Sequence, residues 1–161
     1  HQVNVHLFFE HAHVGLETAS MARNEQSISH QYNVQHKCCN TTSVQKMYGI
    51  ILNDAQLISR SQVYVHPGAD GVRSEQKNAN ILEGKFGRVY SQPELEIYAK
   101  EVKCNHGATI GKLNDKALFY LVTRGFSESE ARQMLMSGFL SELLGEWDDA
   151  ARSFIWDKTV K

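Results

Sequence analysis

The stretch PELEIYAKEVKCNHGATIG, residues 93–111, separates two parts of the chain with different hydrophobic patterns. Before it, short runs alternate between apolar and polar residues, as in β-strands, whereas after it apolar residues recur at helical spacing. Within the stretch, Cys104 and His106 are two residues apart, so in an extended segment their side chains point to the same face. A thiolate and an imidazole can bind iron or zinc, but two ligands do not complete a tetrahedral site. The pair therefore needs further donors.

Short strand patterns recur through the first hundred residues. In ISHQYNV, residues 28–34, Ile, His, Tyr and Val alternate with Ser, Gln and Asn. Polar or glycine-rich turns separate this segment from strand patterns at residues 46–52 and 56–65. Such strands fit a sandwich, a barrel or a solenoid. The Asn, Gln, Ser and Thr residues that flank them favour a solenoid with stacked side-chain ladders, although no exact repeat period is visible.

Two helices are expected after the stretch. The first begins at an N-cap, Asn114 or Asp115, and ends at Gly125, which gives a helix of about ten residues. The second opens with Ser127 and Glu130 at the spacing of a capping box and continues with apolar residues at helical spacing. Together they predict a helical hairpin.

The chain therefore divides into a β-rich part, residues 1–111, and a helical part, residues 112–161, in which a third short helix is expected from about Asp148. With 161 residues, 42% of them hydrophobic, the chain can bury one core with a small appended unit. A net charge of −1 gives no field that would attract nucleic acid or an anionic membrane. No apolar run approaches the roughly 20 residues that span a bilayer. Three cysteines, an odd number, favour a reducing compartment, so we expect a cytoplasmic protein.

The remaining histidines and cysteines offer two weaker candidate metal sites. The members are His6, His11 and His13 near the start, and His36, Cys38 and Cys39 further along. Imidazoles on exposed strands explain the first set without a metal. In the second set, adjacent cysteines point to opposite faces of a strand and do not chelate together easily. We therefore favour structural roles for both sets.

Catalytic motifs are sparse. No phosphate-binding loop, nucleophile elbow or zinc-protease helix is present. Glu94 and Glu96 share one face if Pro93 begins a strand, and such carboxylates can work as an acid and a base. A β-helix enzyme acting on polysaccharide is therefore one alternative, although few aromatic residues are spaced for sugar stacking. A homodimeric interaction module without metal chemistry is another.

The opening stretch and the residues after it also resemble a known family. The block PELEIYAKEVKCNHGATIGKLNDKALFYLVTRGFSESEARQMLMSGFL is similar to the C-terminal half of the SufB/SufD family of the SUF iron–sulfur cluster assembly system, and most of all to its SufD members. Positions that fall on the family pattern include Pro93, Glu94, Val102, Lys103, Cys104, His106, Gly107, Phe119, Tyr120, Arg124 and Gly125. Two features depart from it. Lys100 and Glu101 replace a pair of acids, and Asn105 replaces a serine.

The resemblance implies a mainly β fold, a right-handed parallel β-helix (a solenoid) followed by a small C-terminal helical domain. It implies a scaffold subunit without catalysis of its own. Such a subunit pairs with a SufB-like subunit, or with itself, through the end of the β-helix, and docks a SufC-like ATPase through the C-terminal helices. Members are much longer than 161 residues, so we expect this chain to be a C-terminal piece.

The resemblance also implies the site residues. His106 is expected as a ligand for iron or a cluster at the partner interface, with Cys104 beside it. The cluster would be transient and shared with the partner, with no cofactor permanently bound and with no nucleic acid or membrane as a partner. The residues expected to contact the ATPase are Leu118, Phe119, Tyr120, Arg124, Met134, Leu135 and Phe139.

Overall fold

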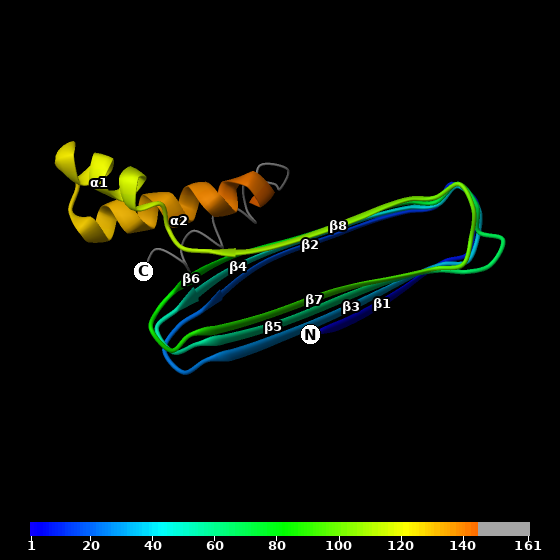
Figure 1. The fold of residues 1–161 in the computed structure, drawn as a ribbon, viewed down its shortest axis with the longest axis horizontal. Helices are drawn as coiled ribbons and strands as arrows, with labels where there is room; N and C mark the ends of the chain where they lie inside the picture. The colour runs from blue at the N-terminus through cyan, green and yellow to red at the C-terminus, as the bar shows by residue number, and fades with distance from the viewer. Residues whose placement is uncertain (145–161) are drawn as a thin grey trace.

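Strands alternate between two parallel sheets along residues 1–144, the part of the chain that the computed structural model describes (Figure 1). The odd-numbered strands form one sheet: β1 (Gln2–Leu7), β3 (Ser27–His36), β5 (Gln56–Val65) and β7 (Arg88–Ile97). The even-numbered strands form the other: β2 (His13–Ala22), β4 (Thr42–Leu52), β6 (Arg73–Glu83) and β8 (Lys103–Gly111). Because the chain passes from one sheet to the other and back on each turn, the fold is a β-solenoid. The predicted mainly β solenoid fold is confirmed.

Successive rungs of the solenoid pair in register. Each residue lies beside one that is 29 to 32 positions later, with the spacing changing from rung to rung. Asparagine ladders join neighbouring rungs: Asn33 donates to Oδ1 of Asn4 at 2.7 Å, and Asn53 donates to Oδ1 of Asn24 at 3.1 Å. The side-chain ladders expected from the sequence are therefore present, and the varying spacing explains why no exact repeat period is visible.

One bend of the solenoid uses the left-handed backbone region on every rung. A positive φ recurs at equivalent positions before the even-numbered strands: His11, Asn40, Gly71 and Glu101. Glycine and asparagine adopt this conformation readily, whereas for glutamate it is sterically unfavourable. The bend before β8 is therefore strained at Glu101, where φ is 55°.

The interior of the solenoid is apolar in places and polar in others. Val34, Val63 and Val65 are fully buried in an apolar cluster. Nearby, the buried imidazole of His36 lies 2.7 Å from Oγ1 of Thr41 through Nδ1 and 2.9 Å from Oγ of Ser43 through Nε2. Burial lowers the pKa of His36 to about 4. The side chain is therefore neutral near pH 7 and belongs to the hydrogen-bonded core.

The last strand ends at Gly111, and the helices α1 (Asp115–Thr123) and α2 (Glu128–Leu144) follow. The predicted N-cap is present, since Oδ1 of Asn114 accepts from the backbone N–H groups of the second and third helical residues. The predicted capping box is also present. The Ser127 N–H donates to Oε2 of Glu130 at 2.8 Å, and the Glu130 N–H donates to Oγ of Ser127 at 3.3 Å.

Helix α2 lies against the outer face of the even-numbered sheet (Figure 1). Its Leu140 and Leu143 are buried together with Tyr48 and Ile50 of β4. The third helix expected from about Asp148 lies outside the described residues. Within the described part, neither helix is long and apolar enough to cross a membrane.

Candidate functional site

The last rung supplies the strand that carries both candidate ligands. Among residues 1–144, β8 pairs with β6 alone, so its other side is an open sheet edge. Such an edge leaves backbone N–H and C=O groups available to another strand. Cys104 and His106 are both on β8. The site is therefore at a place where another chain can approach.

Cys104 and His106 point to the inner side of the even-numbered sheet. In the parallel register Cys104 lies beside Ser74 and His106 lies beside Gln76, and both β6 residues are buried in the solenoid interior. Cys104 packs half-buried against the apolar cluster, whereas His106 is exposed because no described rung covers β8. The expected shared face is present, and His106 lies at an exposed strand edge instead of in the core.

The environment of Cys104 affects its chemistry. Burial raises the pKa of its thiol, although a backbone hydrogen bond from Ser74 acts in the opposite direction. The thiolate is the form that binds metal, so coordination by Cys104 requires loss of a proton.

The pair is incomplete as a metal site. Among residues 1–144, no group of three or more His, Cys, Asp or Glu side chains is placed to hold a metal ion. Iron and iron–sulfur clusters accept thiolate and imidazole ligands, so the donor types of Cys104 and His106 suit them. The chain therefore offers part of a ligand set, as the spacing of the two residues indicates.

The other candidate ligands have structural surroundings. His6, His11 and His13 do not form a three-ligand group, and His36 is hydrogen-bonded within the core. Sγ of Cys39 donates to the carbonyl oxygen of Gly68 at 3.2 Å. The contacts of His36 and Cys39 agree with the structural roles favoured for these two residues.

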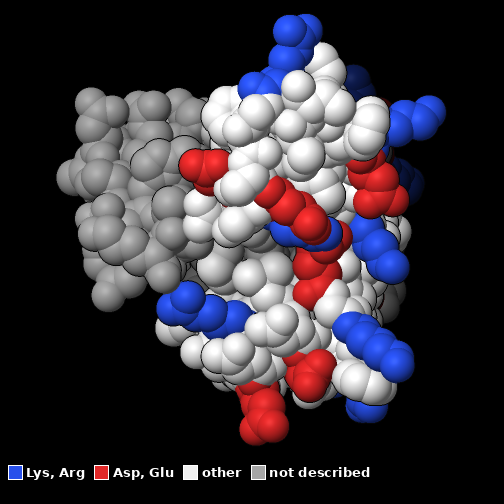
Figure 2. Space-filling model, turned by 90° about the vertical axis from the view of Figure 1, so that its left-hand side faces the viewer, with Lys and Arg blue, Asp and Glu red and all other residues white. Residues whose placement is uncertain are grey.

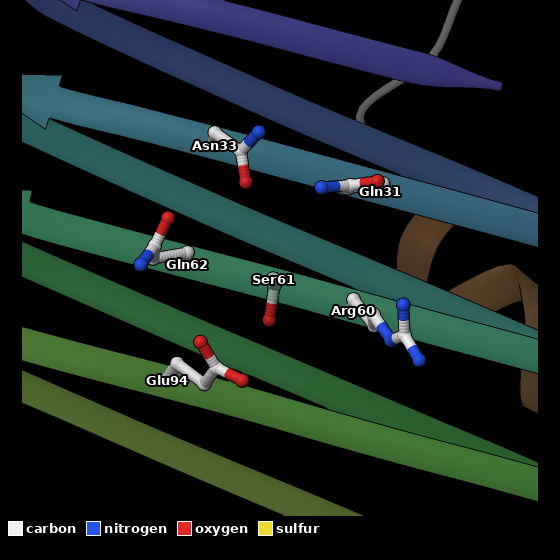
Figure 3. A pocket seen from close by; sticks show the side chains of 6 residues that line it. All are labelled: Gln31, Asn33, Arg60, Ser61, Gln62 and Glu94. Atoms are coloured by element: carbon white, nitrogen blue, oxygen red, sulfur yellow. The ribbon is translucent and has the colours of Figure 1, made fainter.

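Of the two candidate acid and base residues, Glu94 and Glu96, Glu94 lines a small polar pocket on the outer face of the odd-numbered sheet (Figure 3). Its lining residues are Gln31, Asn33, Arg60, Ser61, Gln62 and Glu94. Oε1 of Glu96 accepts from Nε2 of Gln62 at 2.6 Å. The pocket volume of about 60 Å³ is far below the several hundred Å³ of a typical ligand site. This pocket therefore does not support a polysaccharide-cleaving site.

The residues expected to contact an ATPase fall into two groups. The side chains of Phe119, Tyr120 and Met134 are 71%, 55% and 46% exposed. In contrast, Leu135 and Phe139 pack against the core cluster, and the Phe139 ring lies 5.1 Å from the ring of Tyr48. These two residues attach α2 to the solenoid because they are on its inner face, a distinction that helical spacing alone does not give.

Two further residues of that set lie near the exposed group. Leu118 is half-buried, and the Arg124 guanidinium lies 5.1 Å from the centre of the Tyr120 ring. Figure 2 shows acidic and basic side chains interspersed over the end of the molecule where the helices lie. Among the large apolar side chains of the two described helices, Phe119 and Tyr120 are the most exposed.

The fold defines the chain as a parallel β-solenoid with appended helices, and comparison with known proteins identifies its family. Residues 1–139 match a protein family described as "SUF system FeS cluster assembly, SufBD core domain". Because this match covers most of the chain, the chain belongs to the SufBD family, and the resemblance seen in the sequence is confirmed.

Individual relatives agree with this assignment. The iron–sulfur cluster assembly protein SufD of Escherichia coli K12 is 36% identical over 105 residues, which cover 65% of this chain and 24% of the relative. A SufBD family protein of Synechocystis is 34% identical over 114 residues, 71% of this chain and 23% of the relative. SufD of Plasmodium falciparum is 29% identical over 145 residues, 88% of this chain and 10% of the relative. The chain thus spans a quarter or less of the length of these relatives.

Proposed function

We propose that this chain is a scaffold component of iron–sulfur cluster assembly, without catalysis of its own, whose last rung binds a transient iron ion or cluster shared with a partner. His106 is the leading ligand and Cys104 the second. The observation that carries the proposal is that both donors share the inner face of an exposed edge strand, β8. The missing donors would come from a SufB-like subunit or a second copy of this chain.

The C-terminal helices provide a second contact. We assign docking of a SufC-like ATPase to the aromatic surface of Phe119 and Tyr120, together with Leu118, Arg124 and Met134. Large exposed aromatic side chains are typical of protein interfaces, where burying them supplies much of the binding free energy. ATP hydrolysis would take place on that partner, in the cytoplasm.

Anaerobic reconstitution with SufB-like and SufC-like partners tests the ligand role. The variant His106→Ala should lower the iron and sulfide bound per complex, and Cys104→Ser should lower it less. His13→Ala is the matched control because His13 is also exposed on a strand of the even-numbered sheet. Equal loading of His106→Ala and the unaltered chain would contradict the ligand role. Loading without a SufB-like partner would indicate a site between two copies of this chain.

Co-purification with a SufC-like ATPase tests the docking surface. Phe119→Asp and Tyr120→Asp should abolish capture of the ATPase while the solenoid stays folded, because both side chains project from α1 into solvent. Phe86→Asp is the control, since Phe86 is 64% exposed in the bend between β6 and β7. Capture that survives in both helix variants would exclude this surface.

A further inference from the structure

Two glutamine amides and a serine hydroxyl are buried in the solenoid interior without hydrogen-bond partners. Gln45 of β4 and Gln76 of β6 pair in register on neighbouring rungs and are 0% and 2% exposed. Ser61 of β5 is 2% exposed. Within residues 1–144, Oε1 and Nε2 of both amides and Oγ of Ser61 have no partner. Buried polar groups are almost always hydrogen-bonded to protein or to ordered water, so these atoms call for a specific explanation.

The contacts between β4 and β5 show that Ser61 faces Gln45 across the interior. The two strands belong to opposite sheets and run in opposite directions, because the chain turns back between them (Figure 1). Oγ of Ser59 donates to Sδ of Met47 at 3.3 Å, so these two side chains face each other. Alternate residues of a strand point to the same side. The next inward-facing pair in this direction is therefore Gln45 with Ser61.

The three polar groups lie close together, but none of them is bonded to another. Methionine and glutamine side chains have similar lengths, and Met47 reaches the serine that it faces, whereas Gln45 makes no hydrogen bond to Ser61. Gln76 lies one strand spacing from Gln45, about 4.8 Å away along the solenoid. Donors and acceptors from both sheets therefore converge on one place in the interior.

Water has the hydrogen-bonding capacity that this place requires. A buried water typically makes about three hydrogen bonds to polar groups that lack other partners. The Oε1 atoms accept, the Nε2 groups donate, and the serine hydroxyl does both, so one water can bond to all three side chains. None of the three side chains is charged, and an ion buried among them would lack a counter-charge. A neutral ligand of the size of water is therefore the one that fits.

We propose that Gln45, Gln76 and Ser61 form an internal water site between the two sheets of the solenoid. The bound water bridges the two glutamine amides on neighbouring rungs of the even-numbered sheet to the serine hydroxyl of the odd-numbered sheet. It joins the sheets by hydrogen bonds where their own side chains make none. The inference does not depend on the iron or cluster ligands proposed for β8.

NMR spectroscopy of the unaltered chain tests the site directly. The side-chain amide protons of Gln45 and Gln76 should show nuclear Overhauser effects to water with the sign of a molecule that tumbles with the protein. Gln31 is the reference, because it is exposed on the outer face of the odd-numbered sheet and contacts only surface water. Amide protons of Gln45 and Gln76 that show no effect to water, or effects only to each other, would overturn the inference.

Urea unfolding of matched variants gives a second readout. The variants are Gln45→Met, Gln76→Met and the two combined, since methionine keeps the length of the side chain and removes the amide. Gln31→Met is the control and should leave the midpoint unchanged. Each single variant should lower the urea midpoint, because the water loses a partner. The combined variant should lower it by less than the sum, because both amides hold the same water.

The opposite result is expected if the amides are buried without water. Replacing a buried amide that has no partner by an apolar side chain of the same length would then raise the midpoint. A raised midpoint in either single variant, or a loss in the combined variant equal to the sum, would therefore overturn the inference. Circular dichroism checks that each variant folds, and the NMR measurement decides for the unaltered chain if one does not.

Discussion

Arg132 and Glu83 form an ion pair that joins helix α2 to the end of strand β6. Nη1 of Arg132 donates to Oε2 of Glu83 at 2.7 Å, across 49 residues of sequence. The other carboxylate oxygen, Oε1, accepts from the backbone N–H of Leu113 at 2.9 Å, just after β8. A single carboxylate therefore holds both the helix that follows the site and the segment that leaves the site strand.

Removing this ion pair should loosen the helices from the solenoid. Because 38% of the Arg132 side chain is exposed, we expect the pair to contribute about 1 kcal/mol and no more. A double-mutant cycle with Glu83→Gln and Arg132→Leu, measured by urea unfolding, gives the coupling free energy. The more exposed pair Lys77 and Glu142 serves as a comparison and should show weaker coupling. A coupling near zero for Glu83 and Arg132 would contradict this prediction.

Acid should destabilise the chain through His36. Its pKa is about 4 in the folded state and about 6.5 when unfolded, so between these values the unfolded chain binds the proton and the folded chain does not. The unfolding free energy is therefore unaffected by His36 above about pH 6.5 and decreases as the pH falls toward 4. The decrease is about 2 kcal/mol between pH 7 and pH 5. Urea unfolding at several pH values measures it.

The control for this pH dependence is His36→Gln, which should flatten the decline. A remaining slope in the same direction is expected from His30, whose pKa is lowered mainly by burial and also by the N-terminal charge. If His36→Gln loses stability between pH 7 and pH 5 as steeply as the unaltered chain, His36 is not responsible.

A methyl group at Gly49 should be costly. A Cβ atom there would lie 2.6 Å from Cδ2 of Leu57 and would also meet Oδ1 of Asn80, both of which are buried. Overpacking of this kind typically costs 1–3 kcal/mol, so Gly49→Ala should lower the unfolding free energy by about 2 kcal/mol. Gly15→Ala, on β2 with open space around it, should have little effect. The midpoints of thermal unfolding of the two variants test this prediction. Equal midpoints for Gly49→Ala and Gly15→Ala would contradict it.

The strained bend at Glu101 should be improvable. In the two preceding bends, the position equivalent to Glu101 is occupied by Asn40 and Gly71. Asparagine tolerates a positive φ better than glutamate does. Glu101→Asn should therefore raise the unfolding free energy by about 0.5–1 kcal/mol. Glu75→Asn, at an exposed strand position with no such backbone, should give no gain. A loss of stability in Glu101→Asn would mean that the carboxylate makes a favourable contribution greater than the strain.

Much of the fold could be predicted because local signals determine it. Alternation in ISHQYNV identifies an inward-facing row, and Asn114, Ser127 and Glu130 mark the helix starts through bonds within one turn. The shared face of Cys104 and His106 follows from their spacing in a strand.

Features that depend on distant pairing could not be predicted in this way. Gln76 carries no local sign of its neighbour, because the partner His106 is 30 residues later and the rung spacing varies. The inward placement of Phe139 depends on Tyr48 of the solenoid, which helical periodicity does not identify. Glu101 gives no signal either, since glutamate is not a residue that indicates a left-handed bend.

The uniform direction of the strands gives β8 a polarity that limits how identical chains can meet. All strands of the even-numbered sheet are parallel, so the free edge of β8 has one orientation. Two copies related by a twofold axis would bring their β8 edges together with the strands running in opposite directions, as an antiparallel junction. That junction uses both free β8 edges at once. Association through this twofold junction would therefore close at a pair.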